Sequence, residues 1–120
     1  MNKFISYFLL LLFILVVFLL ARIHYSKYLD EASTSWKQGN ITDAISYYEK
    51  IPKFVYPVAG EHLFWIYINP ENEVYDIQKA YSYIKSYQCK NKNQLINSAM
   101  QEYELSKNDK EYLKSKISEC

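Results

Sequence analysis

Glycine is nearly absent from this chain: Gly39 and Gly60 are the only two in 120 residues. A phosphate-binding loop needs several glycines close together, so two isolated glycines exclude that class of nucleotide site. Histidine is equally scarce, and His62 stands beside Glu61 without the second histidine of a zinc-protease motif. The spacing of a nucleophile elbow is also missing. We therefore expect a protein that is not an enzyme and has no cofactor, no metal site and no small-molecule substrate.

Cysteine and net charge are also in short supply. A formal net charge of +1 argues against a nucleic-acid binder that works by bulk electrostatics. Cys89 and Cys120 are the only cysteines, and no Cys-x-x-Cys pair points to redox or zinc chemistry. In an oxidising compartment the two would pair, and closing a loop of this length would stabilise the domain by about 3–4 kcal/mol. The alternative is two unrelated thiols.

Charge is missing altogether from one segment, Phe4 to Ala21, where fifteen of eighteen residues are Leu, Ile, Val or Phe. As a helix it would be about 27 Å long, close to the hydrocarbon thickness of a bilayer. Tyr7 and Tyr25 lie near its two ends, where interfacial aromatic residues are typical. A cleaved signal peptide is the alternative, but its apolar core is normally shorter and is followed by a small-x-small site. We expect an uncleaved membrane anchor.

The basic residues around this segment decide its orientation only weakly. Lys3 precedes it, and Arg22 and Lys27 follow it, so positive-inside counting is nearly balanced. Because the segment is similar to a signal anchor, we expect residues 1–22 to be a membrane anchor with a short cytoplasmic tail. Residues 23–120 would then form one helical domain outside the cytoplasm, on an inner or plasma membrane.

The remainder of the chain carries helical patterns and almost no strand signal. Its only strand-like run, Phe54 to Tyr56, is short and is bounded by prolines. Apolar residues recur at helical spacing between turn and capping residues. We expect six helices: one through the membrane segment to Gly39, and others that begin near Ile41, near Pro57, after Asp76, at Asn93 and at the box Asn108–Glu111.

Two of these helices begin with similar sequences. The stretch NITDAISYYE starts at Asn40 and DIQKAYSYIK starts at Asp76, an offset of 36 residues. Identical residues at equivalent places are Ile41 and Ile77, Ala44 and Ala80, Ser46 and Ser82, and Tyr47 and Tyr83. A period of this length is typical of helical-repeat proteins, in which each unit is a pair of helices. The small residue at Ala44 and Ala80 would let the helices of a pair approach closely.

The repeat resembles the tetratricopeptide superfamily, and its Sel-one-like variant in particular. Ala32, Gly39, Ala44 and Tyr48 match that family's small, turn and aromatic positions in a first unit, and residues 59–87 look like a Sel-one-like second unit. The resemblance implies an all-α fold in which a short α-solenoid of about three antiparallel helix pairs follows the anchor. The last pair, residues 93–120, would be the cap.

Aromatic residues are the most telling feature of what remains, with thirteen tyrosines and two tryptophans. Most would pack in the core, but Trp65 shares a helix face with Glu61 and Ile68, apart from the apolar stripe of Ala59, Leu63, Ile66 and Tyr67. In the family, first helices line the concave binding surface, so we expect Trp65 and Glu61 to contact a partner. Packing of Trp65 on a neighbouring helix is the alternative. Tyr47 and Tyr83 also lie off the core stripe and are further candidates.

Together these features predict a non-enzymatic, membrane-anchored module that binds another protein. The resemblance implies a partner such as a toxin or enzyme outside the cytoplasm, which the module neutralises, as some Sel-one-like proteins do. The alternative is a structural or accessory subunit of a membrane complex, in which the membrane helix is itself an interface. Bulky Leu, Phe, Ile and Val without small-xxx-small patterning argue mildly against that role.

Overall fold

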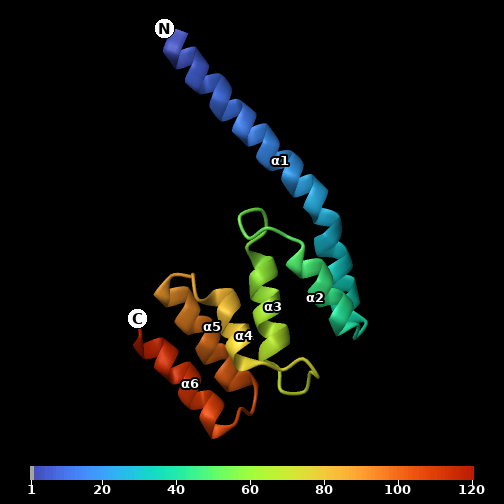
Figure 1. Cartoon of the computed structure of the whole chain (residues 1–120), viewed down its shortest axis with the longest axis vertical. Coiled ribbons are helices and arrows are strands. Elements are labelled where there is room, and N and C mark those ends of the chain that lie inside the picture. Colours follow the sequence, from blue (N-terminus) through green and yellow to red (C-terminus); the bar gives the residue numbers. More distant parts are fainter. Residues whose placement is uncertain (1) are drawn as a thin grey trace. The chain divides into compact units, whose positions relative to one another are not determined.

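A computed structural model describes residues 2–120, which form six α-helices and no strand (Figure 1). This confirms the all-α class and the succession of helix pairs from which a short solenoid is built. The chain divides into two compact units, one up to Ala59 and one from Gly60. The helices are α1 (Asn2–Lys37), α2 (Ile41–Glu49), α3 (Val58–Ile68), α4 (Ile77–Ile84), α5 (Cys89–Glu102) and α6 (Lys107–Ser118).

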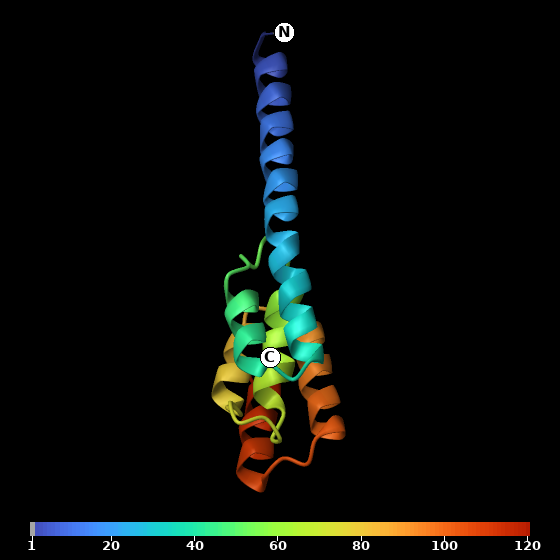
Figure 2. The same cartoon turned by 90° about the vertical axis from the view of Figure 1, so that its right-hand side faces the viewer.

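Helix α1 runs without a break from the apolar segment to the part that packs against α2. No glycine or proline occurs before Gly39, so nothing in the sequence interrupts the helix for its 36 residues. The apolar part is long enough and apolar enough to cross a membrane, and its side chains are exposed. Figure 2 shows the last turns of the same helix beside α2. Residue 22, where the expected anchor ends, lies within this helix, which continues to Lys37 as the lack of a helix breaker before Gly39 predicts.

Gly39 makes the turn between α1 and α2. Its φ of 80° lies in the left-handed region that favours glycine. The Gly39 N–H donates to the Trp36 carbonyl and the Asn40 N–H donates to the Ser35 carbonyl, at 3.0 and 2.8 Å. These two bonds form a Schellman motif, which satisfies carbonyls that the helix end would otherwise leave unpaired.

Small residues bring α1 and α2 together, as the sequence predicts. Ala32 on α1 and Ala44 on α2 are both completely buried. Tyr48 is buried one turn after Ala44, and its ring meets the Trp36 ring edge to face at 6.2 Å between centroids. The first helix pair therefore has a core of close backbones and interlocked aromatic rings.

In the second unit, α3 and α4 are joined by a loop that is held by specific hydrogen bonds. The Asp76 N–H donates to the Tyr67 carbonyl at 2.9 Å, and the Asn72 amide donates to the Ile66 carbonyl. The Asp76 carboxylate then accepts the Lys79 N–H at 3.0 Å, which confirms Asp76 as the cap of α4. The buried side chains of this unit include Leu63, Phe64, Ile66, Tyr67, Ile68, Ala80, Ile84, Ile96, Ala99, Leu105 and Leu113.

The sequence-based starts of the last two helices are wrong. Helix α5 begins at Cys89, after a non-helical Gln88 that makes no side-chain cap bond, and Asn93 lies inside the helix. Helix α6 begins after Ser106, whose hydroxyl accepts the Asp109 N–H at 3.2 Å. The cap is thus Ser106, two residues before Asn108.

The last helix pair is also joined covalently. Cys89 at the start of α5 and Cys120 after the end of α6 form a disulfide, with their Cα atoms 5.8 Å apart. The Tyr75 hydroxyl donates a hydrogen bond to the Asp109 carboxylate, which ties the loop before α4 to the first turn of α6. Both ends of α6 are therefore fixed to the rest of the second unit.

Candidate functional site

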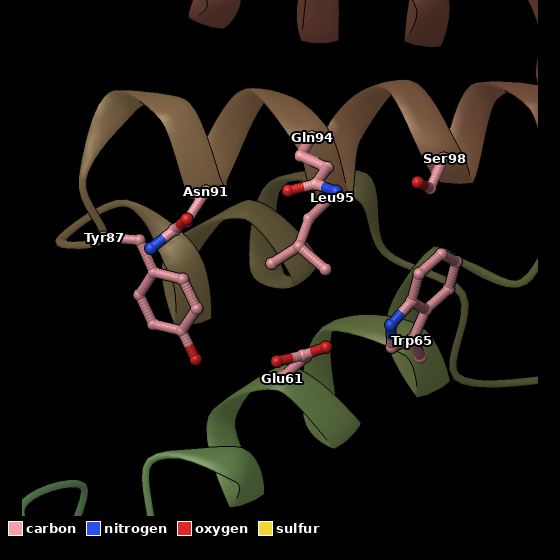
Figure 3. A pocket seen from close by; sticks show the side chains of 7 residues that line it. All are labelled: Glu61, Trp65, Tyr87, Asn91, Gln94, Leu95 and Ser98. Atoms are coloured by element: carbon pink, nitrogen blue, oxygen red, sulfur yellow. The ribbon is translucent and has the colours of Figure 1, made fainter.

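A groove of about 440 Å³ lies between α3 and α5 in the second unit (Figure 3). Helix α3 contributes Glu61 and Trp65, one turn apart on the same face. The segment before α5 contributes Tyr87, whose hydroxyl end projects toward α3. Helix α5 supplies the opposite wall, which consists of Asn91, Gln94, Leu95 and Ser98. The structure thus brings Glu61 and Trp65 together in one concave site.

Trp65 is half-buried, because one side of its ring is packed and the other faces the groove. Its ring meets those of Phe64 and Tyr103 edge to face, at 5.3 and 6.3 Å between centroids. The indole nitrogen is turned toward the groove (Figure 3). Trp65 therefore both packs on a neighbouring aromatic residue and lines the groove. Ile68, expected on the same outer face, is instead fully buried.

Glu61 is the only charged residue that lines the groove. Its carboxylate is half-buried, and within residues 2–120 no ion pair is found for it. Burial, and after it the negative charge of Glu61, raise the pKa of Tyr87, so this phenol stays neutral at physiological pH. Burial lowers the pKa of the neighbouring His62, against the opposing effect of Glu61. Glu61 is thus the one acidic side chain in the groove, and His62 does not line it.

The wall from α5 is polar and was missed by the sequence analysis. Asn91, Gln94 and Ser98 recur at helical spacing around Leu95, and all three are exposed. Their amides and hydroxyl can donate and accept hydrogen bonds, as a peptide backbone requires. The dense run of amide residues between positions 91 and 101 was a visible signal. What the sequence alone lacks is the information that this face of α5 lies opposite Trp65.

Tyr47 and Tyr83 do not line the groove, although both were candidates. Tyr47 on α2 packs on Tyr28 at 6.3 Å between centroids, and the Lys50 ammonium lies 5.3 Å from the Tyr47 ring. Tyr83 on α4 stacks nearly parallel on Tyr67 at 5.7 Å. The two tyrosines are both half-buried, and the ring contacts described above join each of them to a side chain of its own helix pair. A role of Tyr47 and Tyr83 in partner binding stays a prediction, separate from the groove.

Within the described residues 2–120, no three His, Cys, Asp or Glu side chains are close enough to hold a metal ion. No protein family, curated protein or solved structure matches the chain. The likeness to Sel-one-like repeats therefore stays a prediction.

Proposed function

We propose that this protein is a non-enzymatic, membrane-anchored module that binds a segment of another protein in the groove between α3 and α5. The observation that supports this is the position of Trp65 and Glu61, which lie one turn apart and face the same cavity. A large ring that is packed on one side and open on the other is typical of binding anchors, because its position is already fixed before the partner arrives. The first helices of tetratricopeptide-like pairs line such surfaces.

The chemistry of the groove favours a partner segment with a basic side chain. Glu61 offers an uncompensated carboxylate, and a half-buried site screens its charge less than bulk water does. Trp65 and Tyr87 add aromatic faces, on which a guanidinium or ammonium group binds favourably. Arginine suits this combination best, because its flat guanidinium can stack on a ring and donate to a carboxylate at the same time. The amides of α5 would bind the adjacent peptide backbone.

We further propose that α1 spans an inner or plasma membrane and that the helical domain lies outside the cytoplasm. The support is the length and apolar surface of α1, together with the disulfide between Cys89 and Cys120, which persists in oxidising compartments. An anchor confines the module to two dimensions, so that a modest interface is occupied through its raised effective concentration. A toxin or enzyme outside the cytoplasm is one kind of partner that such a module would neutralise.

Site-specific photocrosslinking in the native membrane tests the binding proposal. A photoreactive residue at Ser98 lies in the groove, and one at Lys114 lies on exposed α6 as a control. We expect a defined protein adduct from position 98 that disappears in Glu61→Arg, and no such adduct from position 114. An adduct at position 98 that is unaffected by Glu61→Arg would contradict the role of the carboxylate. Adducts only from positions within α1 would favour an accessory subunit of a membrane complex instead.

A further inference from the structure

The segment between α2 and α3, residues 52–57, carries an exposed aromatic ring that nothing in its own unit covers. Phe54 is 73% exposed. Outside α1, Phe54 and Val58 are the only exposed large hydrophobic side chains among residues 2–120. A single exposed apolar residue is ordinary, but here the two lie four positions apart beside a helix that can enter a membrane.

The fold holds this segment firmly while it turns Phe54 outward. The N–H groups of Val55 and Tyr56 donate to the Pro52 carbonyl, at 3.0 and 3.2 Å, which closes a tight turn. Ile51 and Val55 on either side of Phe54 are buried. The exposure of Phe54 therefore results from an ordered turn whose neighbouring residues are anchored in the core.

Tyr56 fixes the height of this turn along α1. Its hydroxyl donates to the Arg22 carbonyl at 3.0 Å, and the Arg22 guanidinium lies 4.5 Å from the centroid of its ring. Arg22 directly follows Ala21, the last residue of the apolar segment. Figure 1 accordingly shows the turn after α2 close to the point where α1 leaves α2 and continues as the apolar segment. If α1 spans the bilayer, the Tyr56 contact places the turn at the level where the helix leaves it.

We propose that residues 52–57 form a second contact with the membrane, in which Phe54 enters the interface and Lys53 reaches the lipid phosphates. This inference rests on the proposed span of α1. Aromatic and basic side chains at this depth are what the bilayer interface favours, since the rings bury apolar surface and the ammonium stays hydrated. One helix alone leaves a domain free to tilt about its point of exit. A contact beside Arg22 holds the first unit at a defined angle to the membrane.

Fluorescence depth measurements on the full chain in phosphatidylcholine vesicles with some phosphatidylglycerol test this. The native cysteines form a disulfide and none is free, so one introduced cysteine takes an environment-sensitive label selectively. Lys53→Cys is the probe; it removes the Lys53 ammonium but preserves Phe54, so it reports on the entry of the ring into the interface. Thr42→Cys, exposed at the start of α2, is the control in water, and Leu11→Cys reports the bilayer core.

We expect blue-shifted emission at position 53 that is quenched by lipids with shallow quenchers, red-shifted unquenched emission at position 42, and quenching by deep quenchers at position 11. Adding Phe54→Ser to the Lys53→Cys probe should shift the emission at position 53 back toward that at position 42. Emission at 53 like that at 42, with position 11 quenched, overturns the contact but keeps the span. Blue-shifted emission without lipid quenching means that protein covers the turn and rejects the lipid contact. An unquenched probe at position 11 overturns the span and this inference together.

Discussion

The two compact units are built from the same element, a pair of helices, yet they use their aromatic side chains differently. In the first unit Tyr28 and Tyr47 pack on each other with the Lys50 ammonium over both, and Tyr56 packs on Arg22. In the second unit Trp65 packs on Tyr103 with one edge and leaves the other to a groove. The first unit therefore uses its rings to hold the turn after α2 and helix α2 against α1. The second leaves ring surface and a carboxylate open for a partner.

The units also differ in how their ends are secured. The first unit begins with α1, which includes the apolar segment. A long continuous stretch of backbone hydrogen bonds therefore holds this helix. The second ends in α6, a charged helix with a single buried residue, Leu113. A terminal helix with so little apolar burial gains little from packing, so the covalent link from Cys120 to Cys89 has more to contribute there.

Removing the disulfide should have the largest effect, and it should be confined to the second unit. We expect the double variant Cys89→Ser, Cys120→Ser to lose about 3–4 kcal/mol of stability there, because the bridge closes a loop of 31 residues in the unfolded chain. Native-state hydrogen exchange should show lower protection in α5 and α6 and unchanged protection in α2. Wild-type protein under reductant is the control. Unaltered exchange in α6 would mean that packing alone holds it.

Trp65→Ala should separate binding from folding. Through the loss of an anchor we expect partner binding to weaken by about 2 kcal/mol or more. Because the ring is only half-buried, stability should fall by less than the roughly 3–5 kcal/mol typical of a fully buried aromatic residue. Trp65→Phe, which keeps a ring against Tyr103, is the matched control and should retain most of the stability. The measurements are a melt and a titration with the crosslinked partner. Full-strength binding by Trp65→Ala would remove the groove from the proposal.

Ala44→Leu in the first unit and Ala80→Leu in the second test whether the two alanines, which align in the similar sequences, both allow close packing of helices. Both alanines are completely buried, so a larger side chain should overpack the interior and cost about 1–3 kcal/mol in each case. Ser46→Leu and Ser82→Leu, at exposed equivalent positions, are the controls and should cost little. Thermal melts combined with exchange in α2 and α4 locate each loss. A loss from Ala44→Leu without one from Ala80→Leu would mean that the two positions are similar in sequence alone.

Features determined by neighbouring residues could be predicted from the sequence, and those determined by distant packing could not. Apolar spacing gives the six helices, and Gly39 and Asp76 act within a few residues of their own position, as expected. The start of α5 was placed too late, because Gln88 begins the helix without a side-chain cap and so leaves no local signal. Two cysteines allow only one intramolecular disulfide, but the sequence left open whether they pair, and the structure joins Cys89 to Cys120.

In the candidate site, too, one part could be predicted from local spacing and the other depends on distant packing. The spacing of four between Glu61 and Trp65 places them on one face of α3, and this could be read from the sequence. Which helix lies opposite that face depends on how α3 packs in the second unit, so the wall of Asn91, Gln94 and Ser98 was missed. Tyr47 and Tyr83 lie off the core stripe, as the sequence indicates, and each also contacts a neighbouring tyrosine ring, which the sequence alone does not show.

The smallest expected effect concerns the caps of α2 and α4, where the two units differ in a single hydrogen bond. Asn40 and Asp76 are equivalent in the repeat, each preceding the second helix of its pair. The Asp76 carboxylate accepts the Lys79 N–H, whereas Asn40 makes no side-chain cap bond, and its own N–H belongs to the Schellman turn. We expect Asp76→Ala to cost about 1 kcal/mol, which is typical of a lost cap. Asn40→Ala should cost no more than a few tenths of that amount.

Hydrogen exchange of α2 and α4 measures both variants in the same assay, and Asp76→Asn separates the two contributions of the carboxylate. Asparagine keeps an oxygen that can accept the Lys79 N–H but loses the negative charge that interacts favourably with the helix N-terminus, which is worth roughly 0.3–1 kcal/mol. If the hydrogen bond dominates, Asp76→Asn should retain most of the protection of α4 that Asp76→Ala removes. Equal losses from Asp76→Asn and Asp76→Ala would assign the effect to charge. Equal losses from Asn40→Ala and Asp76→Ala would mean that both caps work through the backbone, and that the units do not differ at this position.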